Sequence, residues 1–587
     1  MPIERVNLTT YSPDSLTNNP AILTDGGSKV VFSDAGAGQF NKEYRSEGTY
    51  NVYPTTRGYK TLVDASAMFA KPEAGVVKGA YVATYLDGST AFFVGTPTKL
   101  WSGVVSSGAT TGEWTDKSGS TYSDHGAVNR WHFAQLGDRT IAVANGNTPQ
   151  SMEKGGSNFA AISGAPNAKF VTVANNFVVL ANLEGASTPS TNKEISVWVS
   201  GFGKYDYWTT GDQNLSEFFA LSDTPGEITG VKAIGRNVYV YKLRATHILT
   251  FSSGWSNNLV STQAGAVSND AVVDLGERHV SMGYDNFYSF ESGGGASSLE
   301  NPLYEKIFGR NGDLDRTSLH LVQGRYDRVR GVVFWHYPSV NRITPNYCDK
   351  WVAWGVGTER WAIGETPVAA VVYPNFDTNP GTTYSDFGAT TSFRGDTGSA
   401  ALTWGSSFKL PTESVSSSAV NTLTYTDGSI VGTAGYVSGY VDCVPASSGV
   451  TAGEVKAYAP LLSATPETYA SRSGFIQTGD FGDGVTYKFL RKVRPRFVTS
   501  DLAGNPDGPS IRTTYKDSPD KDTSLTVLSR NDLDEDWTVV SSTTIGESYA
   551  SRWFTLRGNA RYFKFIFEFY GQEISGFDID YEEGGIR

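Results

Sequence analysis

The chain has 587 residues, well beyond the ~250 to 300 residues at which a single hydrophobic core stops growing, so we expect several packed units or one unit built from repeats. Glycine accounts for 64 residues and aromatic residues for 13% of the chain, whereas charged residues make up 18%, which favours short strands joined by tight turns over a helical fold. The formal net charge of −12, without a dense run of lysine and arginine, argues against a protein that grips nucleic acid through its phosphates.

The beginning of the chain, Met1-Pro-Ile-Glu-Arg-Val6, contains no apolar signal segment, and no run of about 18 apolar residues could span a bilayer. The two cysteines, Cys348 and Cys443, are too few for a disulfide scaffold and lack the spacing of metal ligands, so we expect free thiols. The sequence therefore predicts a protein without a membrane span that is made in the cytoplasm.

Residues 1–75 are polar and turn-rich, and we expect them to form an N-terminal arm and part of a platform. A loose repeat follows from residue 76 to residue 365, in which a strand, a tight turn of Gly, Asn or Asp and a second strand recur. The clearest copies of this hairpin pattern are Val82–Val94, Phe133–Val143, Val171–Leu180, Val231–Tyr241 and Val280–Phe290.

The turns of these hairpins recur about every 49 residues, which is typical of the blades of a β-propeller. A sixth unit is indicated by the strand patterns Gly331–Tyr337, Lys350–Gly355 and Glu359–Ile363. We therefore predict an all-β protein in which residues 76–365 form an irregular β-propeller of about six to seven blades. Antiparallel sandwiches also have regularly spaced hairpins, and that alternative stays open at this point.

Residues 366–470 are rich in Ser, Thr and Gly with short apolar fragments, which predicts an exposed β insertion or tip loops. In residues 471–587 strand patterns return, and they predict a C-terminal β-rich domain with a closing strand. The last of these patterns alternates well enough to bury one face. The patterns are Val485–Leu490, Val493–Val498, Ser524–Leu528 and Arg561–Phe569.

The candidates for chemistry are few. Three histidines, His132, His247 and His336, lie in aromatic or apolar strand patterns, where we expect them to be buried and hydrogen-bonded internally. No Gly-x-Ser-x-Gly elbow occurs, and the segment Ser200-Gly-Phe-Gly-Lys204 lacks the first Gly and the final Ser or Thr of a phosphate loop. We predict no catalytic, cofactor-binding or metal-binding residues, and no cofactor.

Acidic clusters occur at Asn531–Asp536 and Asp578–Asp580, and a further pair is Asp313 with Asp315. A glycosidase needs two carboxyl groups about 5 to 9.5 Å apart around a sugar cleft, and a calcium loop needs a central Gly and a closing Glu. Spacing along the chain meets neither requirement, so we interpret these clusters as solvated turns. A propeller glycosidase or carbohydrate-binding tail protein remains the alternative function, and a lectin-like binding module is a third.

An ordered series of motifs runs from residue 195 to residue 290. Shorter motifs occur upstream at Tyr50-Asn-Val-Tyr-Pro54 with Gly58 and at Gly146–Gln150, and downstream at Ile574–Asp580 and Gly584–Arg587. The main series comprises Val197–Gly203 followed by Trp208, Pro225-Gly-Glu-Ile-Thr-Gly230, Gly235-Arg-Asn-Val-Tyr-Val-Tyr-Lys242, Gly265-Ala-Val-Ser268 and Leu275–Phe290.

In this order the motifs resemble the tail nozzle, or tail hub, proteins of short-tailed bacteriophages, the group called tail tubular protein B. The resemblance covers most of residues 40–365 and again 560–587, and it leaves residues 370–550 without a counterpart. The matched positions are structural rather than chemical. They are Trp208, Pro225, Gly226, Ile228, Gly235, Gly265, Ser268, Gly276, Gly283, Gly576, Asp578, Asp580 and Gly585.

The resemblance implies a non-enzymatic virion protein that forms the distal tube of a short phage tail and retains and then conducts DNA. It implies a homohexamer with a peripheral propeller, a platform on the adaptor ring below the portal, and tip elements around the channel. Implied partners are the adaptor ring, tail fibre, spike or needle proteins, and genomic DNA that passes through the lumen without sequence-specific binding. Its expected location is the virion, after assembly in the host cytoplasm.

Overall fold

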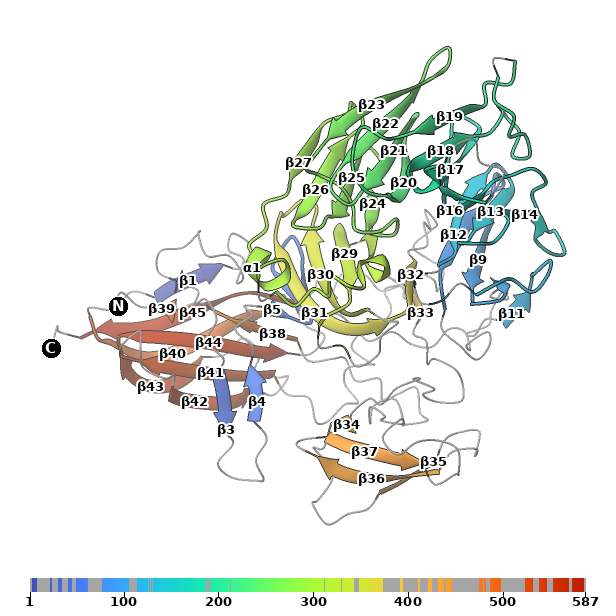
Figure 1. Cartoon of the computed structure of the whole chain (residues 1–587). Coiled ribbons are helices and arrows are strands. Elements are labelled where there is room, and N and C mark those ends of the chain that lie inside the picture. Colours follow the sequence, from blue (N-terminus) through green and yellow to red (C-terminus); the bar gives the residue numbers. More distant parts are fainter. Residues whose placement is uncertain are drawn as a thin grey trace.

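The structure is a computed structural model of the chain. It describes residues 49–61, 77–104, 113–372, 474–497, 523–531, 538–545, 553–569 and 573–584, apart from gaps at 125, 127, 129, 186–190, 212, 311, 329, 341, 343–347, 479 and 482–485. Short strands are also described elsewhere (Figure 1). These are β1 (Ile3–Asn7), β2 (Ile22–Leu23), β3 (Val30–Ser33), β4 (Asn41–Tyr44), β33 (Thr391–Phe393), β34 (Leu410–Pro411), β35 (Asn421–Thr424), β36 (Val431–Val437) and β37 (Tyr440–Pro445).

Six antiparallel sheets of four strands follow one another along residues 80–368, and in each sheet the strands are neighbours in chain order. The first three sheets are β8 (Ala80–Thr84), β9 (Thr90–Gly95), β10 (Leu100–Val104) and β11 (Glu113–Asp116); β12 (His132–Leu136), β13 (Arg139–Val143), β14 (Gln150–Glu153) and β15 (Ala160–Ala161); and β16 (Asn167–Ala174), β17 (Phe177–Glu184), β18 (Ser196–Val199) and β19 (Glu217–Ala220). The next three are β20 (Ile228–Ile234), β21 (Asn237–Lys242), β22 (Thr246–Phe251) and β23 (Trp255–Ser261); β24 (Val272–Asp274), β25 (Arg278–Met282), β26 (Phe287–Glu291) and β27 (Ala296–Ser298); and β28 (Gln323–Asp327), β29 (Val332–Tyr337), β30 (Cys348–Gly355) and β31 (Trp361–Val368). Between them lie the short helices η1 (Lys193–Ile195), α1 (Tyr304–Ile307) and η2 (Leu319–Leu321).

The first strands of these sheets contact one another in succession, from β8 through β12, β16, β20 and β24 to β28. Strand β32 (Ala370–Val372) contacts both β28 and β8 and so closes the ring. The side chain of Gln323 fixes this closure, since its Nε2 donates to Ala369 O at 2.9 Å and its Oε1 accepts from Val371 N at 2.9 Å. The described residues therefore form a β-propeller with six blades, which confirms the predicted fold class (Figure 1).

The predicted hairpins form because their turn residues tolerate left-handed backbone. Gly88 has a φ of 82°, Gly235 a φ of 57°, and the pair Asn175 and Asn176 φ values of 51° and 63°. These turns join the first and second strands of their blades, whereas the copy at Val280–Phe290 joins the second and third strands of the fifth blade. The repeat is irregular because the loops differ in length: β16 begins 35 residues after β12, but β20 begins 61 residues after β16.

The remaining long strands form two sheets that face each other. One has the order β43 (Phe554–Ala560), β40 (Lys488–Phe497), β45 (Glu573–Glu583), β7 (Tyr59–Thr61) and β6 (Val52–Pro54), with β1 also paired to β45. The other has the order β2, β39 (Asp480–Phe481), β44 (Tyr562–Phe569), β38 (Gly474–Gln477) and β5 (Thr49–Tyr50), and β41 (Thr523–Arg530) joins β44 to β42 (Thr538–Ile545).

One hydrophobic core unites these two sheets into a β-sandwich, with Leu490, Phe577 and Ile579 on one side and Phe565 and Phe567 on the other. The rings of Phe567 and Phe577 lie 5.0 Å apart between centroids. The sandwich thus takes strands from residues 49–61 as well as from residues 474–583. The division into 1–75, 76–365, 366–470 and 471–587 stays a prediction, and most of 366–470 lies outside the described residues.

Strand β44 differs from its expected pattern. The alternation in Arg561–Phe569 predicted one buried face, but all eight residues of β44 are buried, including Lys564 and Glu568. The four phenylalanines point into the sandwich core, while β41 and β38 pair along the two edges of the strand. A charged residue in the pattern therefore did not mark a solvent-exposed face.

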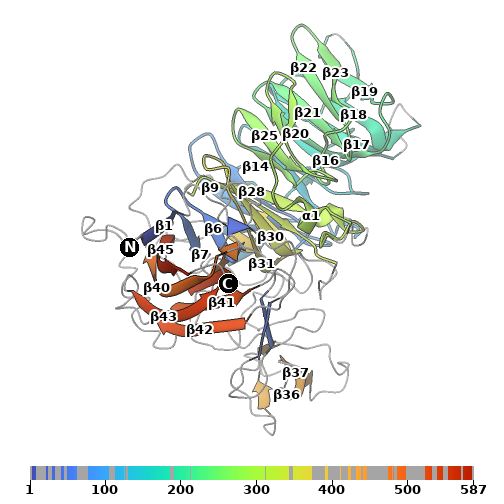
Figure 2. The ribbon, with the colours of Figure 1, turned by 90° about the vertical axis from the view of Figure 1, so that its left-hand side faces the viewer.

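The last blade joins the propeller to the sandwich (Figure 2). Strand β31 contacts β5 and β6, and Asn51 N donates to Ile363 O at 2.8 Å. The Nη1 atom of Arg360 donates to Gly58 O at 3.3 Å, and its Nη2 donates to Thr55 O. Ala362 of β31 belongs to the core of the sandwich itself, so the two units share side-chain packing as well as hydrogen bonds.

Candidate functional site

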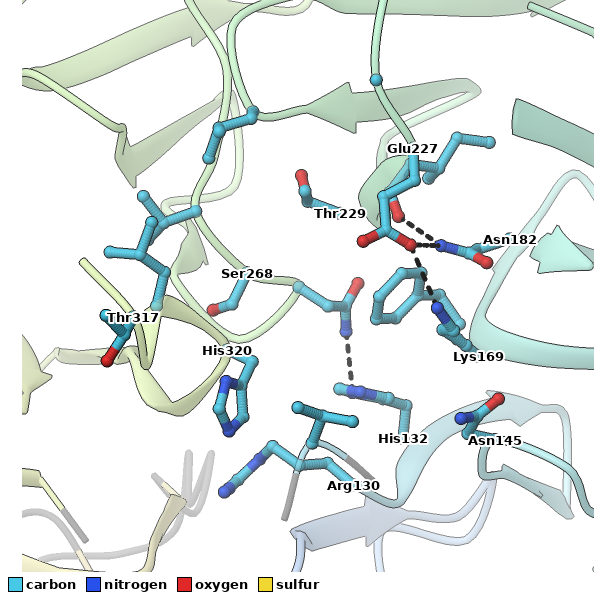
Figure 3. Close-up of a pocket in the computed structure, with 18 of the residues that line it drawn as sticks. Arg130, His132, Asn145, Lys169, Asn182, Glu227, Thr229, Ser268, Thr317 and His320 are labelled. Atoms are coloured by element: carbon cyan, nitrogen blue, oxygen red, sulfur yellow. Dashed lines mark hydrogen bonds and ion pairs between the residues drawn. The ribbon is translucent and has the colours of Figure 1, made fainter. Parts of the chain in front are cut away.

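A cavity of about 470 Å³ lies where the first strands of the propeller blades begin (Figure 3). Its wall is built from the segment before β12, from β16 and β17, from the start of β20, and from the loops before β24 and β28. Because neighbouring blades bring these strand starts together, residues far apart in sequence line one space. Apolar side chains, Phe170, Leu243 and Val267 among them, form much of the wall.

At one end of the cavity lie Arg130, His132 and His320 (Figure 3). Arg130 is 7% exposed, and its Nε lies 3.7 Å from Asp270 Oδ2 without a hydrogen-bond acceptor among the described residues. Its Nη2 donates to Ala369 O at 3.2 Å, next to the strand that closes the propeller. The guanidinium is therefore held at the axis of the ring with one donor unused.

The orientation of His132 follows from its neighbour Asn269. The Oδ1 atom of Asn269 accepts from Val231 N at 3.0 Å, which leaves its Nδ2 to donate to His132 Nδ1 at 3.1 Å. Nδ1 is then the acceptor of the ring and Nε2 carries the hydrogen. Burial lowers the pKa of His132, and the nearby Asp270 only partly opposes this shift, so the ring is neutral at neutral pH.

Asp270 is the buried carboxylate behind this end of the cavity. Burial by itself would raise its pKa, but the charges of Arg325 and Arg130 outweigh burial and hold the pKa well below its usual range. Arg325 Nη2 lies 3.9 Å from Asp270 Oδ1. Lys232 is a further cation near Asp270. Burial lowers the pKa of Lys232, and the charge of Asp270 opposes this shift. One carboxylate thus faces several cations in the interior of the propeller.

At the other side of the cavity, Glu227 accepts from Lys169 Nζ at 3.0 Å and from Asn182 Nδ2 at 3.0 Å (Figure 3). Burial raises the pKa of Glu227, but these two donors outweigh it and lower the pKa below the ordinary value. Glu227 is the one carboxylate among the described residues that line the cavity. A carboxylate that is ionised and accepts two hydrogen bonds is a poor general acid. The described wall therefore does not offer the acid and nucleophile pair of a glycosidase.

The matched positions of the tail-nozzle resemblance lie in turns, in contacts between blades and in the sandwich. Gly235 forms the turn between β20 and β21, and Gly265 is packed so closely that a Cβ atom there would lie 2.1 Å from Lys242 O. The hydroxyl of Ser268 donates to Val322 O at 2.6 Å, which ties the fifth blade to the sixth.

Trp208 is buried against Trp198, with its Nε1 donating to Tyr205 O at 3.1 Å. Three of the matched positions line the cavity: Gly226, Ile228 and Ser268. Of the others, Pro225 precedes β20, Gly276 and Gly283 flank β25, Gly576, Asp578 and Asp580 lie on β45, and Gly585 lies outside the described residues.

Two acidic clusters are not the solvated turns that we expected. Asp578 is fully buried on β45, where its Oδ2 accepts from Arg494 Nη2 at 2.5 Å and its Oδ1 lies 3.3 Å from Arg496 Nε. Asp313 pairs with Lys350 at 2.7 Å, and Asp315 pairs with Arg342. Residues 532–536 of the third cluster lie outside the described residues.

The buried histidines follow the expectation in part. His247 is fully buried between Thr224 and Asn257, at 2.8 and 3.3 Å, and His336 is also buried. His132 is buried and hydrogen-bonded too, but it also lines the cavity. Sequence reasoning missed the cavity because Arg130, Lys169 and Asn269 come from three separate blades, and no spacing along the chain connects them.

Among the described residues no three His, Cys, Asp or Glu side chains gather as a metal site would require. Cys348 is a free, buried thiol, and burial raises its pKa. In the same part of the chain, no helix has the length and apolar character needed to cross a membrane.

Comparison with known proteins identifies no family for the chain. No protein-family model matches the chain, and no curated protein matches it. Similar solved structures include YCF48 bound to D1 peptide (9% identity, 50% of this chain and 82% of that chain, TM-score 0.31) and BamB from Moraxella catarrhalis (10% identity, 56% and 88%, TM-score 0.32). The WD40 β-propeller domain of Doa1 is similar at 8% identity over 52% and 88% of the two chains, with a TM-score of 0.34. Likeness at this level says nothing of function.

Proposed function

We propose that this protein is a structural, non-enzymatic component of the tail nozzle of a short-tailed phage, where it forms a homohexameric ring that retains and then conducts DNA. The main observation in support is that two motifs of the resemblance, one near each end of the chain, lie together in the folded protein. Tyr50–Pro54 with Gly58 and Ile574–Asp580 are more than 500 residues apart, yet both lie in the sandwich, where β7 pairs with β45 in the register Ile574 to Tyr59.

The architecture supports this role in physical terms. A conduit wall needs rigid units with broad faces, and here a propeller and a sandwich are joined by shared packing at β31. The net charge of −12 suits a wall past which DNA slides without sticking, because a basic lining would retain the phosphates. Contacts with an adaptor ring and with fibre, spike or needle proteins belong to the same proposal.

The test is the location and copy number of the chain in intact particles. Electron microscopy of virions labelled for this protein is expected to show it at the distal end of the tail. Light scattering of the purified 63.3 kDa chain, or of rings released from particles, is expected to give six copies. A monomer under all conditions, or a ring of another copy number, would refute the hexamer, and a location outside the tail would refute the role.

The propeller glycosidase or carbohydrate-binding tail protein is the competing proposal. The cavity at the propeller axis is the observation that favours a binding role, and the presence of one carboxylate among its described lining residues counts against hydrolysis. Release of reducing sugar from bacterial surface glycans, abolished by Glu227→Gln, would replace the structural proposal with the enzymatic one. Glycan binding without hydrolysis would instead favour the lectin-like reading.

A further inference from the structure

The cavity at the propeller axis has an excess of positive charge within an acidic protein. Its described lining contains three cations, Arg130, Lys169 and Arg316, and one carboxylate, Glu227. Behind the wall, Asp270 faces two further cations, Arg325 and Lys232. Because the whole chain has a net charge of −12, this excess is a local property of the cavity.

Several donors of the lining have no acceptor among the described residues, although the buried Oδ1 of Asn145 is an acceptor that also lacks a partner there. Arg130 Nε has no hydrogen-bond acceptor among the described residues. The described hydrogen bond of His132 is made by Nδ1, which leaves Nε2–H available. Lys169 uses one of its three hydrogens on Glu227. Arg316 spends Nη1 and Nη2 on the carbonyls of Tyr284 and Phe308, so no carboxylate neutralises it in these contacts.

Some of the lining groups that could accept hydrogen bonds are engaged within the wall. Asn269 uses both ends of its amide, on Val231 N and His132 Nδ1, and Ser268 donates to Val322 O while accepting from Ala271 N. The Oε2 atom of Glu227 accepts hydrogen bonds from two side chains of the wall, Lys169 and Asn182. Because the described lining has three cations and one carboxylate, a ligand that brings a negatively charged acceptor fits this cavity better than one that brings a cation.

The shape and the apolar part of the wall limit the ligand further. A volume of about 470 Å³ is within the range of ~300 to 1,000 Å³ that is usual for small-molecule sites. Phe170, Ile228 and Leu319 offer apolar surface, so the cavity suits a ligand with an apolar body as well as a charged group.

From this combination we propose that the propeller binds a small organic anion in the axial cavity, with its carboxylate or phosphoryl group at Arg130 and His132 and its apolar body against Phe170. Arg130 supplies positive charge, and the hydrogen on His132 Nε2 supplies a donor, since the described hydrogen bond of His132 uses Nδ1. This site is independent of the proposed tail function, because it needs neither the ring nor DNA.

The test uses the purified full chain and four probes at constant ionic strength, with binding measured by isothermal titration calorimetry. Phenylphosphonate and phenylacetate represent the two anionic groups, 2-phenylethanol is the neutral match, and inorganic phosphate lacks the apolar body. We expect saturable binding of at least one of the two aromatic anions, and at least about tenfold weaker binding of both 2-phenylethanol and inorganic phosphate, since one charge-assisted hydrogen bond is worth about that factor.

Two pairs of variants locate the site. Arg130→Gln is expected to weaken binding of the aromatic anion about tenfold, whereas Arg130→Lys, which keeps the charge, retains more of it. Since Arg130 is buried and its replacement can unfold the protein, the second pair is at Val128, which lines the cavity and is 61% exposed. Val128→Asp places a carboxylate at the cavity and is expected to weaken binding of the aromatic anion about threefold or more. The similarly sized Val128→Asn should leave this affinity nearly unchanged.

The proposal is overturned if neither aromatic anion binds, if 2-phenylethanol binds as tightly as phenylacetate, or if inorganic phosphate binds as tightly as phenylphosphonate. Equal affinities of the Val128→Asp and Val128→Asn variants for the anion would also overturn it. None of these results bears on the copy number or location of the protein in particles, so failure here leaves the tail proposal standing.

Discussion

At the scale of single residues, the propeller interior keeps histidines neutral by burying them with fitted partners. His279 is fully buried: the Tyr241 hydroxyl lies 2.8 Å from its Nδ1, and its Nε2 lies 3.1 Å from Ala233 O. Neutral imidazole satisfies both contacts, with Nδ1 accepting and Nε2–H donating. Burial, helped by the charge of Lys232, lowers the pKa of His279 to about 3.

This histidine should make stability depend on pH in a defined direction. The unfolded chain takes up a proton on His279 below about pH 6.5, while the folded chain does so only near pH 3, so the free energy of unfolding falls as the pH falls through this window. One such group contributes about 1.4 kcal/mol per pH unit. In the variant His279→Gln, urea unfolding between about pH 6 and pH 4 should show a slope shallower by about that amount.

The variant serves as its own control at about pH 8, where His279 is unprotonated in both the folded and the unfolded chain and any difference is the constant effect of the substitution. Parallel curves for the two proteins across the acid range would contradict the assignment of a depressed pKa to His279.

At the scale of elements, strands β40 and β45 are joined by a buried ion cluster as well as by their ladder. Asp578 of β45 is fully buried, and Arg494 and Arg496 of β40 approach its two oxygens from the paired strand. The Arg494 guanidinium binds Oδ2 through both Nε and Nη2, at 3.0 and 2.5 Å. Arg494 and Asp578 are direct cross-strand neighbours in the ladder, so these contacts neutralise the carboxylate between the two paired strands.

Removing the carboxylate should leave two arginine charges without their partner. Asp578→Asn is expected to lower the free energy of unfolding of the sandwich by about 3 to 5 kcal/mol, as is usual when one member of a buried ion pair is lost. The matched control is Glu582→Gln on the same strand, because Glu582 pairs with Arg491 of β40 but is half-exposed. That pair should be worth at most about 1 kcal/mol. Urea unfolding of both variants checks this, and equal losses would contradict the role of the buried cluster.

At the scale of the whole molecule, the propeller and the sandwich are in contact through β31 of the last blade and β5 and β6 of the sandwich (Figure 2). Arg360, in the turn before β31, reaches the carbonyls of Thr55 and Gly58 and lies 5.2 Å from the ring centre of Tyr59. The hydroxyl of Tyr59 returns a hydrogen bond to Trp361 O at 3.4 Å. Arg360 and Trp361 of the propeller are thus hydrogen-bonded to Tyr59 of the sandwich strand β7 and to Thr55 and Gly58 of the turn before it.

Weakening this junction should uncouple the unfolding of the two units. For Arg360→Ala we expect calorimetry to show two thermal transitions that are further apart than in the parent protein, because the lost contacts join the units and belong to the core of neither. The control is Arg244→Ala, since Arg244 is 58% exposed on the propeller and its ion pair with Asp285 is long, at 3.6 Å. If both variants shift the transitions equally, the junction does not depend on Arg360.

The sequence by itself determined the local structure of the propeller. Turn residues such as Gly88, Asn176 and Gly235 and the β-rich runs around them act over a few neighbouring residues, so the hairpins, the repeat and the all-β class could be predicted. The first strand of the sixth blade, Gln323–Asp327, was missed, because Gly324 and the charges of Arg325 and Asp327 hide its apolar pattern.

Only the tertiary structure decided which distant residues meet. The axial cavity is lined by residues from separate blades. In the sandwich, Tyr59 pairs with Ile574, and Asp578 is buried although its acidic sequence context predicted a solvent-exposed turn. The physical reason is that burial and charge pairing depend on what lies across a sheet or between blades, whereas a pattern along the chain reports only the preferences of neighbouring residues.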